Sequence, residues 1–315
     1  MKHIYQIEKT DNACVAFGRF DGMHRGHRSV VQTLVREAKS RAVPSVLVSF
    51  VPPEETFVYT SEEEKEHLLK DSGLDVLISC SENEASNPVS FIKKTGASCL
   101  VYGDYRGNKD DCEQSAPEQC APLHAQLSIR KAAQEFGIPI VVCERVCASD
   151  DSCAAGGKNG KAISMEMLDR TFERHDFDTF SRLCGCPYMM IGEVLHGKGL
   201  GKTVGMPTAN LGLAPNKKKP PEGVYATLTR IDGEVFKGLT NIGRRPSVDN
   251  GAHITVETFL LDFSRDIYGK KIELNVCAFI RNVKKFAGLG EVQKQVQKDS
   301  IVARSLLADC IWASD

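Results

Sequence analysis

The sequence predicts two domains of different classes: an α/β domain over residues 1–184 and an all-β barrel or sandwich with a terminal helix over residues 185–315. The chain has 315 residues, which is more than one hydrophobic core usually serves. In the first half, short apolar stretches alternate with amphipathic stretches of helical period, which is typical of βαβ units in a mostly parallel sheet. After "CGCPY" the period becomes that of strands separated by turns.

The first domain is expected to repeat strand and helix along the chain. Strands are expected at residues 13–17, 45–50, 74–80, 97–103 and 138–146, and helices between them at 26–42, 61–73, 87–96 and 127–137. The first helix has one apolar stripe, formed by Val30, Val31, Leu34, Val35 and Ala38. Ser61 opens the second helix, with acidic residues in the first turn. Sheets of this kind bind ligands beyond the carboxyl ends of their strands.

The second domain follows a polar, glycine-rich loop and a short helical stretch. The loop is expected over residues 148–162 and the helical stretch over about 164–184. Strands are expected within 223–243, 254–263 and 270–281, with a hairpin turn at Asp232-Gly233, and a last helix over about 289–311 with Val292, Val296 and Val302 among its apolar positions. Several strands followed by one helix predict a small barrel or sandwich.

Composition excludes several classes of partner. The net charge is −1, so no overall basic field points to nucleic acid. The longest apolar runs are too short to span a bilayer, and the first residues lack the apolar core of a secretory signal. We therefore expect a cytoplasmic protein without a membrane partner, and the sequence predicts no oligomeric state. The 12 cysteines include no Cys-x-x-Cys pair and no zinc-like spacing, so we expect ordinary, reduced thiols.

The first group of residues that suggests chemistry is "GRFDGMHRGH", where the first strand leads into the first helix. His24 and His27 flank Gly26 close to the expected start of that helix. A helix start offers free backbone N–H groups and the positive end of a dipole, which suit phosphate. Two imidazoles there could donate hydrogen bonds to charge that develops on a transferring phosphoryl group. The alternative is a tight turn with a capping histidine.

This stretch resembles the His-x-Gly-His signature of the nucleotidyltransferase superfamily, and "FDGMHRGH" is similar to the FAD synthetase module of bifunctional bacterial flavokinase/FAD synthetases. The resemblance implies a Rossmann-like nucleotidyltransferase domain in which a nucleoside monophosphate is transferred from ATP to a phosphate acceptor. It implies two catalytic histidines, His24 and His27, and phosphate-binding residues Gly18, Phe20, Asp21 and Gly26. "YGDYRG" is similar to the flavin-side segment of that module, which implies flavin contacts from Asp104 and Tyr105.

The second group is "GEVLHGKGLGKTVGMPTANLG", which opens the second domain. Its glycines could form a loop whose amides hold phosphates, although glycine is also common in the turns of β domains. "GMPTANLG" looks too polar for a core strand. Pro207 fixes the backbone before Thr208 and Asn210, whose neutral oxygens suit Mg²⁺ bound to ATP, because phosphates and waters complete its ligand shell. The alternative is an Asx or ST turn that caps itself.

The third feature is a carboxylate on an apolar strand face. In "VETFLLDF" the strand period puts Glu257 on one face with Phe259, Leu261 and Phe263. A carboxylate on such a face is costly unless it has a partner or a task. As a general base, Glu257 could take the proton from an alcohol that attacks ATP. The alternative is an edge position at the mouth of the barrel, where the side chain is simply hydrated.

Residues from about 185 to 310 closely resemble riboflavin kinase through the glycine loop, "PTAN", "GVYA", "NIGRRPS", "ETFLLDF", "DIYGKKI" and "FIRNVKKF". The resemblance implies a six-stranded barrel of Greek-key type that uses ATP with Mg²⁺ and converts riboflavin to FMN. By position, it implies Mg²⁺ and phosphate contacts from Thr208 and Asn210, and a base at Glu257. It implies a flavin-closing loop with Arg281 and Phe286. The phosphate-binding loop would contain Gly197, Gly199, Gly201, Lys202 and Gly205.

The first domain departs from its family at one segment. The family's Ile-Ser-Ser-Thr-x-x-Arg segment, which binds ATP phosphates, corresponds here to "ISMEMLDR" over residues 163–170. Glu166 replaces the threonine, Asp169 takes the arginine position, and Arg170 follows one place later. Two acids at a polyphosphate site are repulsive. "FVPPEE" also lacks the histidine of the family's Pro-His-Pro.

These observations leave three hypotheses for the first domain. The main hypothesis is a riboflavin kinase fused to a nucleotidyltransferase-like domain, with FAD synthesis put in question by the 163–170 segment. The second is a non-catalytic flavin- or nucleotide-binding module that regulates or scaffolds the kinase. The third is a cytidylyltransferase that acts on another phosphorylated alcohol.

Overall fold

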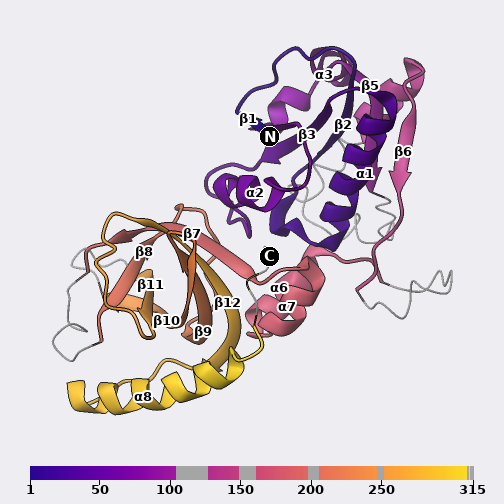
Figure 1. The fold of residues 1–315 in the computed structure, drawn as a ribbon. Coiled ribbons are helices and arrows are strands. Elements are labelled where there is room, and N and C mark those ends of the chain that lie inside the picture. Colours follow the sequence, from indigo (N-terminus) through magenta and orange to yellow (C-terminus); the bar gives the residue numbers. More distant parts are fainter. Residues whose placement is uncertain (104–126, 149–160, 198–205, 247–251, 311, 313–315) are drawn as a thin grey trace. The chain divides into compact units, whose positions relative to one another are not determined.

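The computed structural model describes residues 1–103, 127–148, 161–197, 206–246, 252–310 and 312. The chain forms two compact units, Met1–Ile163 and Ser164–Asp315, which are described separately (Figure 1). The helical stretch that follows the glycine-rich loop belongs to the second unit. A functional boundary near residue 185 stays a prediction.

The first unit is built on a six-stranded sheet with the order β1-β4-β3-β2-β5-β6, and all its described pairings are parallel. The strands are β1 (Lys2–Ile4), β2 (Ala13–Gly18), β3 (Ser45–Val51), β4 (Val76–Ser81), β5 (Ala97–Gly103) and β6 (Ile140–Cys143). The predicted parallel sheet is confirmed. Strand β1 was not predicted, because its three residues contain no apolar run. β2 lies between β3 and β5, so its carboxyl end is a topological switch point, where such sheets bind ligands.

Helices cover both faces of this sheet (Figure 1). The helices are α1 (Arg25–Arg41), α2 (Glu62–Leu69), α3 (Pro88–Thr95) and the helical residues 127–135, with two 3₁₀ turns, η1 (Asp21–Met23) and η2 (Glu82–Ala85). The predicted stripe of α1 is buried on one face with Leu47, while Phe91 of α3 and Ile129 pack on the other. Ser61 and Glu64 form a capping box that starts α2.

The second unit begins with two helices, α6 (Met165–Glu173) and α7 (Phe177–Cys184), where one helical stretch was expected. The break lies at His175, whose φ of 59° is left-handed. Asp176 then caps α7 by accepting a hydrogen bond from the backbone N–H of Thr179. Phe172 and Phe180 both pack edge-on against Tyr188 and attach the two helices to the first barrel strand.

Six antiparallel strands close the barrel in the order β10-β11-β8-β7-β12-β9, which confirms the predicted all-β domain. The strands are β7 (Tyr188–Leu195), β8 (Thr208–Gly212), β9 (Gly223–Ile231), β10 (Glu234–Pro246), β11 (Ala252–Leu260) and β12 (Lys271–Arg281). Asp232 and Gly233 form the expected hairpin turn, with positive φ values of 51° and 86°.

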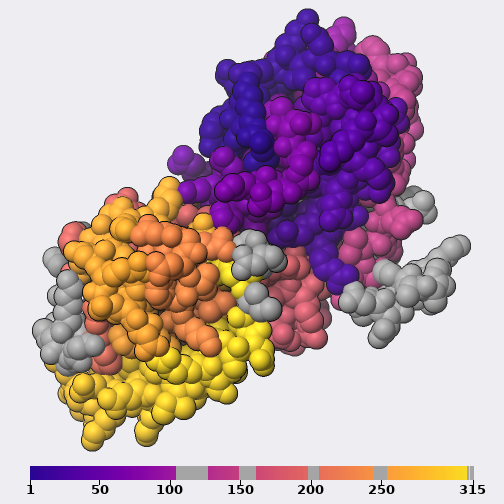
Figure 2. Space-filling model, in the orientation of Figure 1, coloured from indigo at the N-terminus to yellow at the C-terminus, as the bar shows by residue number. Residues whose placement is uncertain are grey.

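The barrel has a hydroxyl-lined interior and an apolar outer face under a helix. Inside, Thr227, Thr240 and Thr258 are fully buried and form a chain of hydrogen bonds of 2.9 and 3.0 Å. The terminal helix α8 (Leu289–Leu306) packs along the outside, in yellow in Figure 2. Beneath it lie outward side chains of the strands, among them Val224, Ala226, Leu228, Leu239 and Phe259. Alternate residues of β11, including Glu257, therefore face outward.

The cysteines mostly follow the prediction of reduced thiols. The free thiols among the described residues are Cys14, Cys80, Cys99, Cys143, Cys184, Cys186, Cys277 and Cys310. The prediction is wrong at Cys147, which is disulfide-bonded, because sequence spacing does not show which thiols come within bonding reach. Among the helices in the described part of the chain, none has both the length and the apolar character needed to cross a bilayer.

Candidate active sites

The first candidate site lies where β2 ends and α1 begins. Between Gly18 and His24 the chain turns through η1, where Phe20, Gly22 and Met23 all have positive φ. Asp21 fastens this turn: its Oδ1 accepts hydrogen bonds of 2.9 Å from the backbone N–H groups of Gly22 and Thr60. The turn is thereby held at the switch point of the sheet, and it places both predicted histidines there.

His24 caps helix α1. Its Nδ1 accepts hydrogen bonds from the backbone N–H groups of Gly26 and His27, at 3.1 and 3.4 Å, so its own proton is on Nε2. The His24 and His27 rings stack with centroids 3.7 Å apart. A Cβ atom at Gly26 would lie 2.9 Å from Cε1 of His24, so the glycine makes room for the ring. The capping alternative is thus correct for His24, and the cap leaves its Nε2–H group available to a ligand.

Burial keeps both histidines neutral at pH 7. Desolvation lowers the pKa of His24 to about 4. It lowers the pKa of His27 well below its ordinary value, and the charges of His24 and Lys65 lower it further. Among the described residues, Nδ1 of His27 is buried and has no hydrogen-bond partner. A buried polar atom without a partner is costly unless a ligand completes the site.

A buried lysine lies beside the histidines, and the sequence did not reveal it. Lys65 of α2 is 2% exposed, and its Nζ bonds to Ser49 Oγ at 2.5 Å and Glu62 Oε1 at 2.6 Å. Its Nζ also lies 3.4 Å from the carbonyl oxygen of Arg19, just after β2. The run "SEEEKE" suggests a solvated helix face, but Lys65 is spaced i, i+4 from the buried Leu69, which was the available signal.

Segment 163–170, where the sequence differs from the FAD synthetase pattern, carries two acidic residues that form ion pairs within the second unit. Ser164 caps α6 by accepting a hydrogen bond from the backbone N–H of Met167. Glu166 pairs with Arg170 at 2.8 Å, and Asp169 pairs with Lys218 at 2.6 Å. The two acids that were expected to repel polyphosphate therefore have compensating cations.

The second candidate site lies on the outer face of the barrel. "TANLG" is strand β8, a half-exposed barrel strand that the sequence did not reveal, since the stretch was expected only to be too polar for a core strand. The reason is alternation: Ala209 and Leu211 are buried, while Thr208 and Asn210 are partly exposed on the opposite face. In the strand register, Asn210 lies opposite Glu257 of β11.

Glu257 stands in a short polar row across three strands. It pairs in register with Asn210 on one side and with Asn241 of β10 on the other. Its Oε1 accepts a hydrogen bond of 3.3 Å from Thr255 Oγ1. Phe259, two residues further along β11, packs near α8. The carboxylate thus lies on a partly apolar outer face, as predicted.

The predicted apolar face is shorter than expected. β11 ends at Leu260, and Asp262 has a φ of 58°, so Leu261 and Phe263 do not continue the alternation that begins at Glu257. The sequence alone could not show this, because the run "FLLDF" keeps an apolar pattern through the turn.

The beginning of the glycine loop touches Asn210. A Cβ atom at Gly197 would lie 2.3 Å from Nδ2 of Asn210, so no larger residue fits there without displacement. The structure therefore brings the first loop glycine and the "PTAN" stretch together. The other predicted loop residues, Gly199, Gly201, Lys202 and Gly205, and the predicted flavin contacts Asp104 and Tyr105 lie outside the described residues.

Arg281 and Phe286 lie together beside α8. The Arg281 guanidinium donates to Oδ2 of Asp299 through Nε and Nη2, at 2.9 and 2.8 Å, and lies 5.9 Å from the centre of the Phe286 ring. Gln295 donates to Oδ1 of Asp299 at 2.8 Å. Asp299 was not predicted from the sequence, although a carboxylate spaced i, i+3 from Val296 on an apolar helix stripe was a usable signal.

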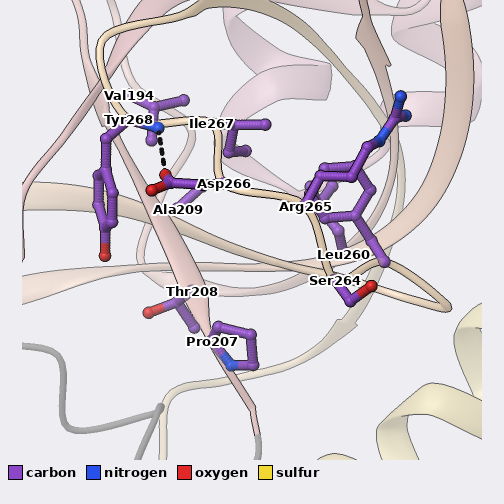
Figure 3. A pocket seen from close by; sticks show the side chains of 11 residues that line it. Val194, Pro207, Thr208, Ala209, Leu260, Ser264, Arg265, Asp266, Ile267 and Tyr268 are labelled. Atoms are coloured by element: carbon purple, nitrogen blue, oxygen red, sulfur yellow. Dashed lines mark hydrogen bonds between the residues drawn. The ribbon is translucent and has the colours of Figure 1, made fainter.

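A cavity of about 310 Å³ adjoins Thr208 (Figure 3). Pro207 and Thr208 form part of its wall, and the segment 263–268 forms another. Tyr268 stacks on His196 with ring centroids 3.9 Å apart, and its backbone N–H donates to Oδ1 of Asp266 at 3.1 Å. The cavity combines apolar side chains, an aromatic ring and a hydroxyl, which suits a heteroaromatic ligand with a polar extension.

The residues on the outer face of β8 also fit a nucleotide-bound magnesium ion. Thr208 and Asn210 present two neutral oxygens from alternate positions of one strand, and Gly197 leaves room for close approach. Mg²⁺ that arrives with ATP needs few protein ligands, because phosphate oxygens and waters supply the rest. The donor set therefore matches this ion when phosphates accompany it.

Comparisons with known proteins match both units. The family model described as riboflavin kinase matches residues 184–307, and the one described as FAD synthetase matches residues 6–104. A bifunctional riboflavin kinase/FMN adenylyltransferase of Escherichia coli (strain K12) is 30% identical over 315 residues, covering 93% of this chain and 92% of the relative. Proteins with the same name from Haemophilus influenzae and Bacillus subtilis are 29% and 27% identical, covering 92% and 94% of this chain and 93% and 94% of the relatives.

One solved structure covers nearly the whole chain. It is a Streptococcus pneumoniae protein described as a macrolide-efflux protein, with a TM-score of 0.72 and 24% identity, covering 95% of this chain and 96% of that one. At this identity the likeness shows the fold alone.

Proposed function

The chain belongs to the family of bifunctional riboflavin kinase/FMN adenylyltransferases, and on that premise we propose that its barrel phosphorylates riboflavin to FMN with ATP. The observation that carries this proposal is the outward polar row, in which Asn210 lies opposite Glu257 and against Gly197. It joins a base, a pair of neutral ligands and a glycine that permits close approach on one face. Phosphoryl transfer to an alcohol uses a base for the attacking hydroxyl, a metal on the phosphates and a closely fitted nucleotide, and these residues can supply each of the three.

Glu257 is the proposed general base. Its carboxylate takes the proton of the attacking riboflavin hydroxyl while the oxygen forms a bond to the γ-phosphorus and the bond from that phosphorus to the leaving oxygen of ADP breaks. The hydrogen bond from Thr255 restrains the carboxylate. Thr208 and Asn210 would hold Mg²⁺, which supplies positive charge to the phosphate oxygens when it is bound.

The cavity beside Thr208 is the proposed site of the adenine base. Its apolar side chains Val194, Leu260 and Ile267 and the ring of Tyr268 suit a planar base, while Thr208 lies where the phosphates would leave the cavity. Arg281 and Phe286, braced by Asp299, are the proposed flavin side of the site.

Product analysis tests the kinase assignment. The purified chain is incubated with riboflavin, ATP and Mg²⁺, and riboflavin, FMN and FAD are separated by chromatography. FMN should appear in proportion to ADP. ADP formation without FMN would contradict the assignment, because it would show ATP hydrolysis with no transfer to the flavin.

We also propose that the first unit adenylylates FMN. The supporting observation is the stacked, neutral pair His24–His27 at a helix start, with Nδ1 of His27 unpartnered among the described residues. In this step an FMN phosphate oxygen attacks the α-phosphorus of ATP and pyrophosphate leaves. N–H groups of the imidazoles would donate to the phosphate oxygens as charge develops.

Replacing His27 by Ala tests the adenylylation proposal with FMN and ATP as substrates. The variant should lose FAD and pyrophosphate formation but keep FMN formation from riboflavin. An intact chain that binds FMN or ATP without forming FAD would support the regulatory alternative instead. Turnover of CTP with another phosphorylated alcohol would support the cytidylyltransferase alternative.

A further inference from the structure

Two thiols from different elements of the second unit meet on the outside of the barrel. Cys277 lies on β12, and Cys310 lies shortly after the end of α8. Their side chains hydrogen-bond to one another. The Cys277 thiol is partly buried, whereas Cys310 is exposed and also lies 3.4 Å from the carbonyl oxygen of Leu306.

The segment that carries Cys310 is anchored on both sides. Leu307 is fully buried under the barrel's outer face, and Trp312 is 4% exposed. The guanidinium of Arg230 lies 4.5 Å from the centre of the Trp312 ring. Cys310 is therefore held against the strand rather than carried on a free tail, and its contact with Cys277 persists in the folded unit.

The two thiols differ in reactivity. The hydrogen bond from Cys277, with a smaller contribution from the charge of Lys237, lowers the pKa of Cys310 to about 6 against the opposing effects of burial and Asp309. The hydrogen bond with Cys310 and burial raise the pKa of Cys277. The thiolate is the reactive form of cysteine, so the exposed Cys310 is the first nucleophile at neutral pH. Cys277 reacts in the second step.

We propose that Cys310 and Cys277 form a thiol modification site that reacts with low-molecular-weight disulfides and closes to an intramolecular disulfide. Cys310 Sγ attacks one sulfur of the small disulfide, forms a mixed disulfide and releases one small thiol. Cys277 then attacks Cys310 Sγ, loses its proton and releases the second small thiol. Two protein thiols are oxidised and one small disulfide is reduced to two thiols, so the exchange balances.

Closure would tie the end of α8 to β12. β12 ends at Arg281, whose ion-pair partner Asp299 lies on α8. The disulfide would therefore be a second link between β12 and the end of α8. It closes a loop from residue 277 to residue 310 and constrains the unfolded chain. We expect a higher melting temperature and unchanged chemistry, since neither cysteine is among the residues assigned to substrates. This inference does not depend on the proposed kinase activity.

The chain contains a matched control. Cys14 and Cys99 are paired in register on β2 and β5 and are hydrogen-bonded, but both are fully buried and burial raises the pKa of each. Full-length protein is incubated with glutathione disulfide at pH 7.5 and digested without reduction, and the peptides are identified by mass spectrometry. A cross-link between Cys277 and Cys310 should form, while Cys14 and Cys99 remain thiols.

Two variants separate the steps. Cys277→Ser should accumulate glutathione on Cys310, and Cys310→Ser should leave Cys277 a thiol. In the wild type, the cross-link should raise the melting temperature by several degrees, and dithiothreitol should reverse this. The proposal is overturned if Cys310 stays unmodified, if it keeps glutathione without joining Cys277, or if the buried Cys14–Cys99 pair oxidises equally.

Discussion

At the scale of single residues, Glu257 has the position that the proposed kinase chemistry requires of a base. It lies on a partly apolar outer face, and its strand neighbours in register are Asn210 and Asn241. A general base must lie within hydrogen-bond reach of the hydroxyl whose proton it takes, and this face also carries the proposed nucleotide ligands.

Glu257→Gln should keep the fold and flavin binding and lower FMN formation by roughly 10²–10⁴-fold, because the amide cannot accept the proton. Single-turnover formation of FMN measures this. Glu166→Gln is the control, since that side chain is exposed on α6 and its partner is Arg170. Turnover near the wild-type rate in Glu257→Gln would remove Glu257 from the mechanism.

Asn210→Ala should shift the Mg²⁺ titration of the kinase to higher concentration while riboflavin still binds. The reason is the loss of one of two neutral ligands beside the phosphates. Asn241→Ala provides a matched control on the opposite side of Glu257. If both variants titrate like the wild type, Asn210 has only a structural role in β8.

The histidines of the first unit predict a pH effect on stability. The pKa of His24 is about 4 in the folded state and near 6.5 when unfolded, so the unfolded chain binds the extra proton first. The contribution of neutral His24 to the free energy of unfolding is fully present above pH 6.5. It is lost as the pH falls towards 4, and it amounts to about 2–3 kcal/mol. Chemical denaturation of His24→Asn, which keeps a cap acceptor, should show a flatter profile between these pH values than the wild type. Equal slopes would contradict the assignment.

At the scale of elements, β8 shows what sequence patterns can and cannot give. Helices with a clear apolar stripe, such as α1, and buried parallel strands were predicted because their periods are long and strong. β8 was not predicted because its polar residues argued against a core strand, whereas in a barrel strand only alternate residues, here Ala209 and Leu211, need be apolar. Lys65 and Asp299 were missed because a charged residue on a helix is expected to face solvent. Only the apolar neighbours at i±3 and i±4 indicate that its face is buried.

The contact between Gly197 of the glycine loop and Asn210 of β8 predicts how a methyl group added at Gly197 affects ATP binding. Gly197→Ala should displace the side chain of Asn210, because the new Cβ would lie 2.3 Å from Nδ2, and should weaken ATP binding at least about tenfold. Gly290→Ala on α8 is the control, since a Cβ there meets nothing within 4 Å. Calorimetric titration with a non-hydrolysable ATP analogue measures both. Unchanged affinity in Gly197→Ala would show that this contact does not shape the nucleotide site.

At the scale of the whole molecule, the kinase should be faster than FAD synthesis. The barrel face has the proposed base, the proposed neutral ligands and the first loop glycine, whereas the segment expected to bind triphosphate has Glu166 and Asp169 paired to their own cations within the second unit. Paired acids no longer repel phosphate strongly, but they supply no positive charge to a transition state that needs it. Feeding FMN and ATP directly and comparing FAD formation with FMN formation from riboflavin measures the ratio. Equal rates would mean that other residues bind the triphosphate in place of this segment.

The threonine chain inside the barrel has a consequence for how this sequence can change over evolutionary time. Thr227, Thr240 and Thr258 satisfy one another's hydroxyl groups across three strands, in a space without exposure to water. Substituting one of them by valine keeps the volume but leaves a neighbouring hydroxyl unpaired, whereas substituting all three removes both the donors and the acceptors. The first step is thus the costly one, and homologous barrels should carry either the full hydroxyl set or a fully aliphatic one, with few intermediates between them.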